Sequence, residues 1–347
     1  MKAVVLAAGE GKRLNPLTQL RPKPLLPVAG IPLILRTAQA LSSIGVEEIV
    51  VVTSPTGNQV MDALRGLKDV KVRRAIQESP RGTAHALLAA KSFIQGEERF
   101  ILVYGDLFFD REMLRGLVTH VSRKFDGGVL AVQQEEAKRF GVIIEEDGVL
   151  RRIIEKPEAL EGPALINSGV YVLPGETVEV AEGLQPSIRG EYELTDALTR
   201  LVERGRRIAA YKHPRGYWLD VGTPANYLEA NLLALRELSR QPAPSAATGA
   251  IEGSYIAERV RLGRRVTVRS SALMEEAEVG ENSILESVVL LENAVVEPGS
   301  RLFYTILAEG GKAGRGCSLR GVREKPVVIS PGSTAPPYST AGPGAVF

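Results

Sequence analysis

The sequence predicts two folded regions in series, an open α/β sheet followed by a short β-helix. The first prediction rests on apolar, β-branched runs that alternate with helical patterns from residue 1 to about residue 235. The second rests on a six-residue spacing of apolar residues after residue 250. Between them lies a segment rich in Pro, Ser and Ala, at 239–250, whose composition is typical of a linker.

Three nearly continuous apolar runs define the predicted sheet, at 3–8, 49–53 and 100–104. Runs of this kind are typical of parallel strands that are buried on both faces. Helical patterns at 34–44 and 83–93 lie between them. We therefore expect an open, mixed but mostly parallel sheet that helices cover on both sides.

The C-terminal region repeats apolar residues at every sixth position, with one slip. Two sets keep this spacing on either side of the slip: Leu262, Val268 and Met274, then Val279, Leu285 and Leu291. Hexapeptide repeats predict a β-helix, with about four coils if each takes roughly 18 residues. The alternative is a small sandwich of irregular strands.

These patterns set the limits of the expected domains. The first domain covers 1–235 and the linker covers 236–250. The β-helix covers 251–325, and the last stretch, 326–347, has five prolines and many small polar residues. Because such a composition rarely builds a packed core, we expect that stretch to be an extended or mobile tail.

The composition excludes several classes of protein. The 43 Lys and Arg residues nearly balance the 41 Asp and Glu residues, so no strong positive field favours nucleic acid. One cysteine, Cys317, cannot form an intrachain disulfide, and with three His residues it cannot build a Cys/His metal cage. The apolar run at 3–8 is far shorter than the ~20 residues of a membrane span. We expect a soluble, cytoplasmic protein.

A glycine-rich loop follows the first predicted strand, with the sequence AGEGKRL from Ala8. Glycines there let the backbone approach a phosphate group. The loop differs from a dinucleotide fingerprint at Leu14, where a third glycine is needed, and from a P-loop because Arg13 follows Lys12. Arg13 and Lys23, from the neighbouring PKPL segment, supply two cations for a triphosphate. The alternative is a surface turn with solvated charges.

At this point the sequence LAAGEGKRLNPLTQLRPKPLLPVAGIPLI closely resembles the signature of sugar-1-phosphate nucleotidylyltransferases. Further motifs follow in the order of that family: QESPRGTAH from residue 77, YGD from 104, FGV from 140, EKP from 155, NSG from 167 and WLDVG from 218. The resemblance implies a Rossmann-like nucleotidyltransferase topology, and several branches of the family add a left-handed β-helix. It also implies attack of a sugar 1-phosphate on the α-phosphorus of a nucleoside triphosphate, with release of pyrophosphate.

The resemblance also implies a nucleotide site. Arg13 and Lys23 match its triphosphate positions and are the expected catalytic residues, because two anions must be positioned and neutralised. The resemblance places the rest of the nucleotide site at Leu6, Ala8, Gly9, Gly11, Gln77, Gly82 and Thr83. Gln77 offers both a donor and an acceptor, which favours a pyrimidine base. Arg81 departs from the family, since many relatives have an apolar residue there.

Two further groups complete the implied site. Asp106 and Asp220 match the metal-binding aspartates of the family and are expected to hold Mg²⁺, although either could be a turn or cap residue by itself. The sugar 1-phosphate is expected to contact Tyr104, Gly141, Glu155, Lys156 and Asn167. Carboxylate and amide groups can bind sugar hydroxyls, and the lysine can meet the sugar phosphate.

We therefore expect an enzyme that joins a pyrimidine nucleotide, from dTTP or UTP, to glucose 1-phosphate. The alternatives are a mannose-1-phosphate guanylyltransferase, an N-acetylglucosamine-1-phosphate uridylyltransferase and a non-catalytic regulatory or scaffold subunit. Acetyl transfer is not expected, because the repeat region has no histidine to act as a general base. We expect the C-terminal region to join copies of the chain into a homo-oligomer, and the nucleotide site to stay assembled without it.

Overall fold

The computed structural model describes residues 1–238 and 251–347, so nearly all of the expected linker, 236–250, lies outside the described residues. The chain divides into two compact units. The first contains Met1–Gly9 and Ile34–Trp218, and the second contains Glu10–Leu33 and Leu219–Phe347. Within the described residues, the helices are all too short or too polar to cross a membrane.

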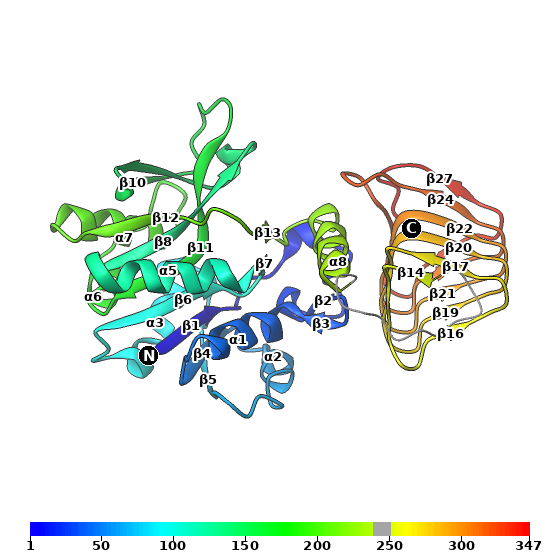
Figure 1. The fold of residues 1–347 in the computed structure, drawn as a ribbon, viewed down its shortest axis with the longest axis horizontal. Helices are drawn as coiled ribbons and strands as arrows, with labels where there is room; N and C mark the ends of the chain where they lie inside the picture. Colours follow the sequence, from blue (N-terminus) through cyan, green and yellow to red (C-terminus); the bar gives the residue numbers. More distant parts are fainter. Residues whose placement is uncertain (239–250) are drawn as a thin grey trace. The chain divides into compact units, whose positions relative to one another are not determined.

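A nine-stranded sheet forms the centre of the first unit, in the order β5-β4-β1-β6-β11-β8-β12-β10-β9 (Figure 1). Its strands are β1 (Lys2–Leu6), β4 (Glu48–Thr53), β5 (Lys71–Ile76), β6 (Arg99–Tyr104), β8 (Gly127–Gln134), β9 (Gly141–Glu146), β10 (Val149–Glu155), β11 (Ala164–Pro174) and β12 (Ile208–Lys212). Strands β5, β4, β1 and β6 are parallel, and three of them, β1, β4 and β6, are the strands that the buried apolar runs predicted. The expected α/β sheet is confirmed, and its antiparallel pairings lie beyond β6, where β11 pairs with β6 and β8.

Helices cover both faces of this sheet. The helices of the unit are α1 (Leu33–Ser43), α2 (Asn58–Asp62), α3 (Thr83–Ala89), α4 (Lys91–Ile94), α5 (Arg111–Lys124), α6 (Thr177–Glu182) and α7 (Leu194–Glu203). Val129 of β8 lies in a buried cluster with residues of α3, α6 and α7. Its neighbour Gly128 faces Leu117 and Val121 of α5. Because adjacent strand residues point to opposite faces, α5 covers the other side.

The second unit contains α8 (Pro224–Leu238) and a stack of short parallel strands (Figure 1). The strands are β14 (Ile251–Glu252), β15 (Tyr255–Ile256), β16 (Arg261–Leu262), β17 (Thr267–Arg269), β18 (Ala272–Leu273), β19 (Glu278–Val279), β20 (Ile284–Leu290), β21 (Val295–Val296), β22 (Arg301–Leu307), β23 (Lys312–Ala313), β24 (Ser318–Arg320), β25 (Val327–Ile329), β26 (Thr334–Ala335) and β27 (Thr340–Ala341). They form stacked sheets, one of them in the order β16-β19-β21-β23-β26. The predicted β-helix is thereby confirmed.

The coil of this β-helix has 17 residues, one fewer than the three hexapeptides expected. Val268 pairs with Leu285, and Leu285 pairs with Leu302, so each position returns 17 residues later. The missing residue explains the slip in the apolar spacing. At one corner of the coil, Ser270 and Ser287 both have a positive φ, of 46° and 56°. The five strands of the β16 sheet also exceed the four coils expected.

The stack continues past residue 325, where the sequence placed the start of an extended tail. Strands β25, β26 and β27 pair in parallel with β22, β23 and β24. Val327 and Ile329 are fully buried. Pro331, Pro337 and Pro343 each lie at the first position of a turn between strands, where a fixed φ suits the chain. The prolines therefore belong to the coil corners of the β-helix.

One coil is longer than the others. Thr305 pairs with Val327, so this coil returns after 22 residues. The extra residues form a loop at 321–326, in which Arg323 makes a bidentate ion pair with Glu229 of α8. The single insertion in the repeat thus carries a contact between the β-helix and α8.

Further short elements connect the larger ones. In the first unit these are β7 (Leu107–Phe109) and η3 (Ala137–Arg139), and in the second they are η1 (Lys12–Leu14), η2 (Lys23–Leu25) and β2 (Pro27–Val28) paired with β3 (Ile31–Pro32). The short strand β13 (Trp218–Asp220) lies where the chain passes from the first unit to the second. The cation-bearing segments η1 and η2 thus belong to the same compact unit as the β-helix.

Candidate active site

In the first unit, the ends of β1 and β6 lie side by side. The amide of Gly105 donates a hydrogen bond to the carbonyl of Leu6 over 2.8 Å. A Cβ on Gly105 would lie 3.0 Å from that carbonyl oxygen, so a larger residue would push the two ends apart. Asp106 therefore emerges at the carboxyl end of β6, which lies beside the carboxyl end of β1. Ligands of open α/β sheets bind at this edge.

The residues expected to read the base lie together in the structure. The Gln77 amide nitrogen donates to the carbonyl of Gly82 over 3.2 Å and lies 3.1 Å from Nδ1 of His85. Gly82 has a φ of 110°, and a Cβ there would lie 2.5 Å from the carbonyl oxygen of Tyr192. Only glycine fits this close approach without strain. The hydroxyl of Thr83 accepts a hydrogen bond from the amide of Leu194 over 2.9 Å.

The residues expected at the sugar end also converge. Gly141 and Glu155 are register partners on β9 and β10. A Cβ on Gly141 would lie 2.9 Å from a Glu155 carboxylate oxygen and 3.5 Å from Cβ of Asn167. The Nζ atom of Lys156 lies 3.8 Å from the Glu155 carboxylate. Gly141, Glu155, Lys156 and Asn167 therefore form one polar cluster.

Tyr104 is partly buried at the end of β6. The Tyr171 hydroxyl donates to that of Tyr104 over 3.0 Å. Burial of the Tyr104 hydroxyl raises its pKa further above neutrality. A Cβ on Gly169 would lie 2.5 Å from the Tyr104 ring. The absence of a side chain at Gly169 thus leaves room for the Tyr104 ring.

Three further residues of this polar cluster, Arg189, Glu193 and Thr195, were not among the site residues predicted from the sequence. Arg189 lies 3.5 Å from the Glu155 carboxylate and 3.2 Å from the Glu193 carboxylate. Thr195 donates a hydrogen bond to Glu155 over 3.4 Å. These residues lie in the segment RGEYELTD, from Arg189 to Asp196, whose alternating charges and polar groups were the available signal.

The two glutamates of this cluster are both hard to ionise. Burial, reinforced by the nearby Glu155 charge, raises the pKa of Glu193 to about 7, against the opposing effect of Arg189. Burial likewise raises the pKa of Glu155, although Lys156 and Arg189 favour its charged form. A polar ligand that donates hydrogen bonds to these carboxylates would relieve the loss of water around them.

In the second unit, Asp220 lies between the two predicted phosphate-binding cations. Its Oδ2 atom is 3.5 Å from an Arg13 guanidinium nitrogen, and its Oδ1 atom is 3.3 Å from Nζ of Lys23. The Lys23 side chain is 7% exposed, whereas that of Arg13 is 63% exposed. The Asn226 amide donates to the Asp220 carbonyl over 2.7 Å and holds this turn to α8. Cations 10 residues apart in the chain thus meet at one carboxylate.

Two glycines allow this cluster to close. Gly11 has a φ of 67°, and a Cβ there would lie 3.1 Å from Cβ of Lys23. A Cβ on Gly222 would lie 2.9 Å from an oxygen of Asp220 and 3.1 Å from the Arg13 guanidinium. Leu14, which stands where a dinucleotide fingerprint needs glycine, is fully buried. The loop is therefore built around a packed leucine.

The described residues, 1–238 and 251–347, hold no group of three or more His, Cys, Asp or Glu side chains that could cage a metal ion. A magnesium ion that takes most of its ligands from phosphates and water needs only one or two carboxylates. Asp220 fits that requirement, because its carboxylate oxygens are hard donors and its side chain is 17% exposed.

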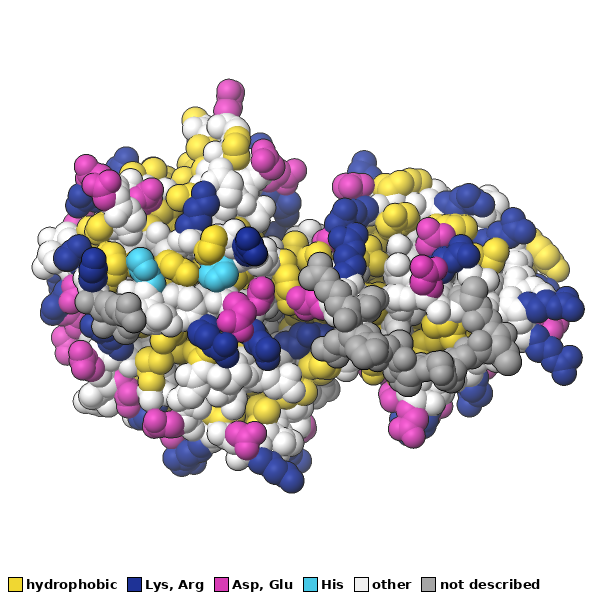
Figure 2. Space-filling model, viewed as in Figure 1, with side chains coloured by type: hydrophobic (Ala, Val, Ile, Leu, Met, Phe, Trp, Pro, Cys, Tyr) yellow, Lys and Arg dark blue, Asp and Glu magenta, His cyan; other side chains and the backbone are white. Residues whose placement is uncertain are grey.

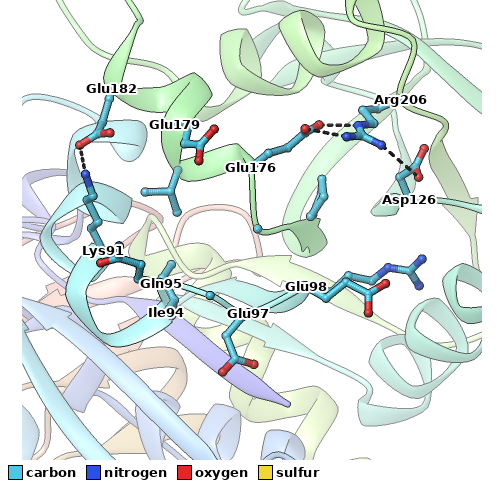
Figure 3. Close-up of a pocket in the computed structure, with 15 residues that line it drawn as sticks. Lys91, Ile94, Gln95, Glu97, Glu98, Asp126, Glu176, Glu179, Glu182 and Arg206 are labelled. Atoms are coloured by element: carbon cyan, nitrogen blue, oxygen red, sulfur yellow. Dashed lines mark hydrogen bonds and ion pairs between the residues drawn. The ribbon is translucent and has the colours of Figure 1, made fainter.

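A pocket of about 570 Å³ lies elsewhere in the first unit (Figure 3). It is lined by Glu97, Glu98 and Arg99 before and at the start of β6, and by Glu176 and Glu179 after β11. This is the amino end of β6, opposite to Asp106. Figure 3 shows two of its basic side chains paired with acidic ones, Lys91 with Glu182 and Arg206 with Glu176 and Asp126. The pocket is thus separate from the predicted site residues.

The surface charge agrees with the balanced composition. Figure 2 shows Lys and Arg side chains interspersed with Asp and Glu side chains on the face in view, over both units. The formal net charge is +2. A balance of this kind favours small anions held by a few placed cations over a long polyanion.

Residues 2–237 match the family model described as nucleotidyl transferase. The chain belongs to this family. The match includes every site residue predicted from the sequence, from Leu6 to Asp220, and the family expected from the opening motif is confirmed. In this nucleotidyl transferase, the strands of the β-helix follow the region that matches the family model.

Named relatives agree with this nucleotidyl transferase assignment. A protein of Methanococcus maripaludis named bifunctional protein GlmU is 34% identical over 261 residues, which are 74% of this chain and 60% of that protein. A bifunctional sugar-1-phosphate nucleotidylyltransferase/acetyltransferase of Sulfurisphaera tokodaii is 33% identical over 69% of this chain and 56% of that protein. The chain therefore spans little more than half the length of these relatives.

A solved structure resembles this nucleotidyl transferase in fold. It is a crystal structure of a candidate glucose-1-phosphate thymidylyltransferase from Bacillus anthracis in complex with a sucrose. The TM-score is 0.61 at 28% identity, and the match covers 71% of this chain and 98% of the other. The α/β fold of the first unit thus resembles that of this solved structure.

Proposed function

We propose that this protein transfers a nucleoside monophosphate from dTTP or UTP to a sugar 1-phosphate, and that glucose 1-phosphate is the sugar substrate. The observation that carries the proposal is the cluster in which Arg13 and Lys23 flank Asp220, within a chain of the nucleotidyl transferase family. Two cations at one carboxylate suit a triphosphate and its metal ion.

The reaction needs positioning and charge neutralisation. An oxygen of the sugar phosphate attacks the α-phosphorus of the nucleotide, and the bond from that phosphorus to the bridging oxygen breaks, so that pyrophosphate leaves. Lys23 would hold the charge that grows on the α-phosphoryl oxygens, and Arg13 would hold the phosphates that leave. Asp106 and Asp220 are the carboxylates that we assign to Mg²⁺, which neutralises phosphate charge when bound.

The base and the sugar are assigned from the two polar clusters of the first unit. The side-chain amide of Gln77 contains both a hydrogen-bond donor and an acceptor, so it can pair with the edge of uracil or thymine. Glu155 and Asn167 can bind sugar hydroxyls, and Lys156 can bind the sugar phosphate. The name of the Bacillus anthracis protein supports glucose 1-phosphate. Nucleotide binding by Leu6, Ala8, Gly9 and Gly11 stays a prediction from the sequence.

The test is a matrix of substrates with Mg²⁺. Purified protein is incubated with dTTP, UTP, GTP, CTP or ATP, each with the 1-phosphates of glucose, N-acetylglucosamine, galactose and mannose. Released pyrophosphate and the nucleotide sugar are measured. We expect the highest rate with a pyrimidine nucleotide and glucose 1-phosphate, and none after chelation of Mg²⁺. A preference for GTP with mannose 1-phosphate, or for UTP with N-acetylglucosamine 1-phosphate, would replace the proposed substrates.

The proposal includes assembly of the chain into a homo-oligomer through the β-helix, because the open ends of a short β-helix present strand edges for pairing. Light scattering on the full-length protein measures its mass in solution. A monomer at micromolar concentration would contradict this assembly. If no combination of substrates released pyrophosphate while the protein remained folded, a non-catalytic role would replace the enzyme.

A further inference from the structure

The segment that carries both phosphate-binding cations, 10–33, is fastened to α8. The hydroxyl of Tyr227 donates to the carbonyl of Pro27 over 2.7 Å, and the amide of Ala29 donates to the side chain of Asn231 over 2.9 Å. Tyr227 and Asn231 are fully buried. These contacts hold the part of the segment that follows Lys23, and they leave the part before Lys23 to be held by other residues.

Arg21 makes that second attachment, to the β-helix. Its guanidinium contacts the carboxylates of Glu292 and Glu309, with a distance of 3.3 Å from Nη1 to a Glu292 oxygen and shorter contacts from its other nitrogens. The Arg21 side chain is 18% exposed and that of Glu309 is 13% exposed. Charge-assisted, largely buried contacts of a planar guanidinium fix its geometry closely.

The two glutamates belong to a column that the 17-residue repeat creates. Four successive coils place a glutamate at the first position of the same turn: Glu258, Glu275, Glu292 and Glu309. Backbone hydrogen bonds connect these turns, from Asn293 to the Glu275 carbonyl and from Gly310 to the Glu292 carbonyl. Stacked carboxylates repel one another unless cations lie between them. Arg259 supplies a cation to Glu275, at 3.4 Å, and Arg21 supplies one to Glu292 and Glu309.

Little freedom remains between Arg21 and the functional lysine. Only Pro22 separates them, with a φ of −59°, and Pro24 follows Lys23. The amide of Leu25 donates to the Pro22 carbonyl over 2.9 Å and closes a tight turn around Lys23. Because proline fixes φ, a displacement of Arg21 is passed on to Lys23 with few dihedral angles to absorb it. The Nζ atom of Lys23 then meets Asp220 at 3.3 Å.

We propose that Arg21 is a positioning residue, which holds Lys23 in its place by anchoring the phosphate-binding segment on the glutamate column of the β-helix. The inference rests on the proposed function for the role of Lys23 in the reaction. It gives the β-helix a part in ordering the nucleotide site, in contrast to the expectation from the sequence that this site stays assembled without the C-terminal region.

The test uses full-length variants in which the anchor is removed from either side. Arg21→Ala removes the cation, and the double variant Glu292→Gln with Glu309→Gln removes the carboxylates. Arg259→Ala is the control, since it breaks the ion pairs to Glu275 of the same column and to the adjacent Glu276, and leaves Arg21, Glu292 and Glu309 in place. Arg21→Lys keeps a charge but loses the planar fork.

Steady-state kinetics and calorimetry form the first measurement. A displaced catalytic group costs on the order of 10- to 100-fold in rate, so we expect kcat to fall by this factor in Arg21→Ala and in the double variant. Arg21→Lys should recover part of it, and Arg259→Ala should stay within about twofold of the wild type, as expected for an exposed pair. Nucleoside triphosphate should still bind at full stoichiometry, which separates lost positioning from lost folded protein.

Hydrogen exchange is the second measurement and does not require activity. We expect the amides of 10–33 to exchange at least tenfold faster in Arg21→Ala and in the double variant, with β1, β4 and β6 unchanged. Wild-type kcat with unchanged exchange in both would overturn the inference, and so would faster exchange throughout both units. If the wild type forms no nucleotide sugar, the proposed function is wrong. The exchange measurement still tests whether Arg21 anchors the segment 10–33. If Arg21→Ala does not fold, Arg21→Lys takes its place in both measurements. Wild-type kcat and wild-type amide exchange in Arg21→Lys would then overturn the proposed role of Arg21.

Discussion

The predicted site residues of the two units are held in different ways. In the first unit, Gln77, Glu155 and Asn167 lie in or directly after strands of the nine-stranded sheet, and main-chain ladders fix them. In the second unit, Arg13 and Lys23 lie in short 3₁₀ turns, and ion pairs and contacts to α8 hold them. The sheet therefore supplies a rigid frame for the predicted base- and sugar-binding groups, while the predicted phosphate-binding cations depend on ion pairs and on contacts to α8.

The largest expected effect is that of Lys23→Ala. Lys23 lies beside Asp220, and its loss would remove the charge that we propose to stabilise the transition state. We expect kcat to fall by roughly 10² to 10³, or about 3 to 4 kcal/mol, with a smaller loss of nucleotide affinity. Steady-state kinetics and calorimetric affinity decide this, and Lys23→Arg should restore only part of the rate. An unchanged kcat with weak binding would show that Lys23 holds only the ground state.

Asp220→Asn tests the carboxylate that pairs with Lys23 and Arg13. The substitution keeps the size of the side chain and removes the charge between Arg13 and Lys23, so we expect more than a tenfold loss of rate in a protein that stays folded. Asp106→Asn is the matched variant in the first unit, with the same expectation. The rate is measured at saturating Mg²⁺. If both variants keep more than a tenth of the wild-type rate, the metal assignment is wrong.

Glu193→Gln tests the polar cluster around Glu155 in the first unit, through the pH dependence of the free energy of unfolding. The pKa of Glu193 is about 7 in the folded protein, against 4.5 for an ordinary glutamate, because burial and Glu155 disfavour its charge. Between these values the folded state binds more protons than the unfolded state, so stability falls as the pH rises from 4.5 to 7. We expect this contribution to cost the wild type about 2 to 3 kcal/mol at pH 8 relative to pH 4.

Denaturant unfolding at pH 4 and pH 8 measures this contribution. The variant lacks the titrating carboxyl, so its stability should fall less than that of the wild type over the same interval. Equal losses in the two proteins would contradict the assigned pKa of Glu193. Glu155, Glu191, Arg189 and Lys156 face the same group, and all four stay in place in both proteins.

The smallest expected effect is that of Arg323→Ala. Arg323 attaches the inserted loop at 321–326 to Glu229 of α8, but its side chain is 48% exposed. Pairs of this exposure contribute about 1 kcal/mol or less, and high salt weakens them further. Thermal unfolding at low and high salt measures the change. A loss of several kcal/mol would mean that this loop, rather than Arg21, is the main attachment of the β-helix.

Much of the fold is visible in the sequence because it depends on local patterns. Buried runs such as 49–53 and 100–104 predicted their strands, and the six-residue spacing of Leu262, Val268 and Met274 predicted the β-helix. The exact coil was harder, since one apolar slip does not distinguish an 18-residue coil with a defect from a regular 17-residue coil. The prolines after residue 325 led to the wrong prediction of an extended tail, because composition does not say which turn a proline occupies.

The sequence alone determined the family, the sheet, the repeat and the identity of the residues that could meet phosphates and a sugar. Those features follow from short motifs whose residues lie close along the chain. Only the tertiary structure decided that Arg189 and Glu193 join Glu155, and that Arg21 pairs with Glu292, 271 residues away. An ion pair leaves no periodic trace in a sequence, because its partners are chosen by folding distant segments together.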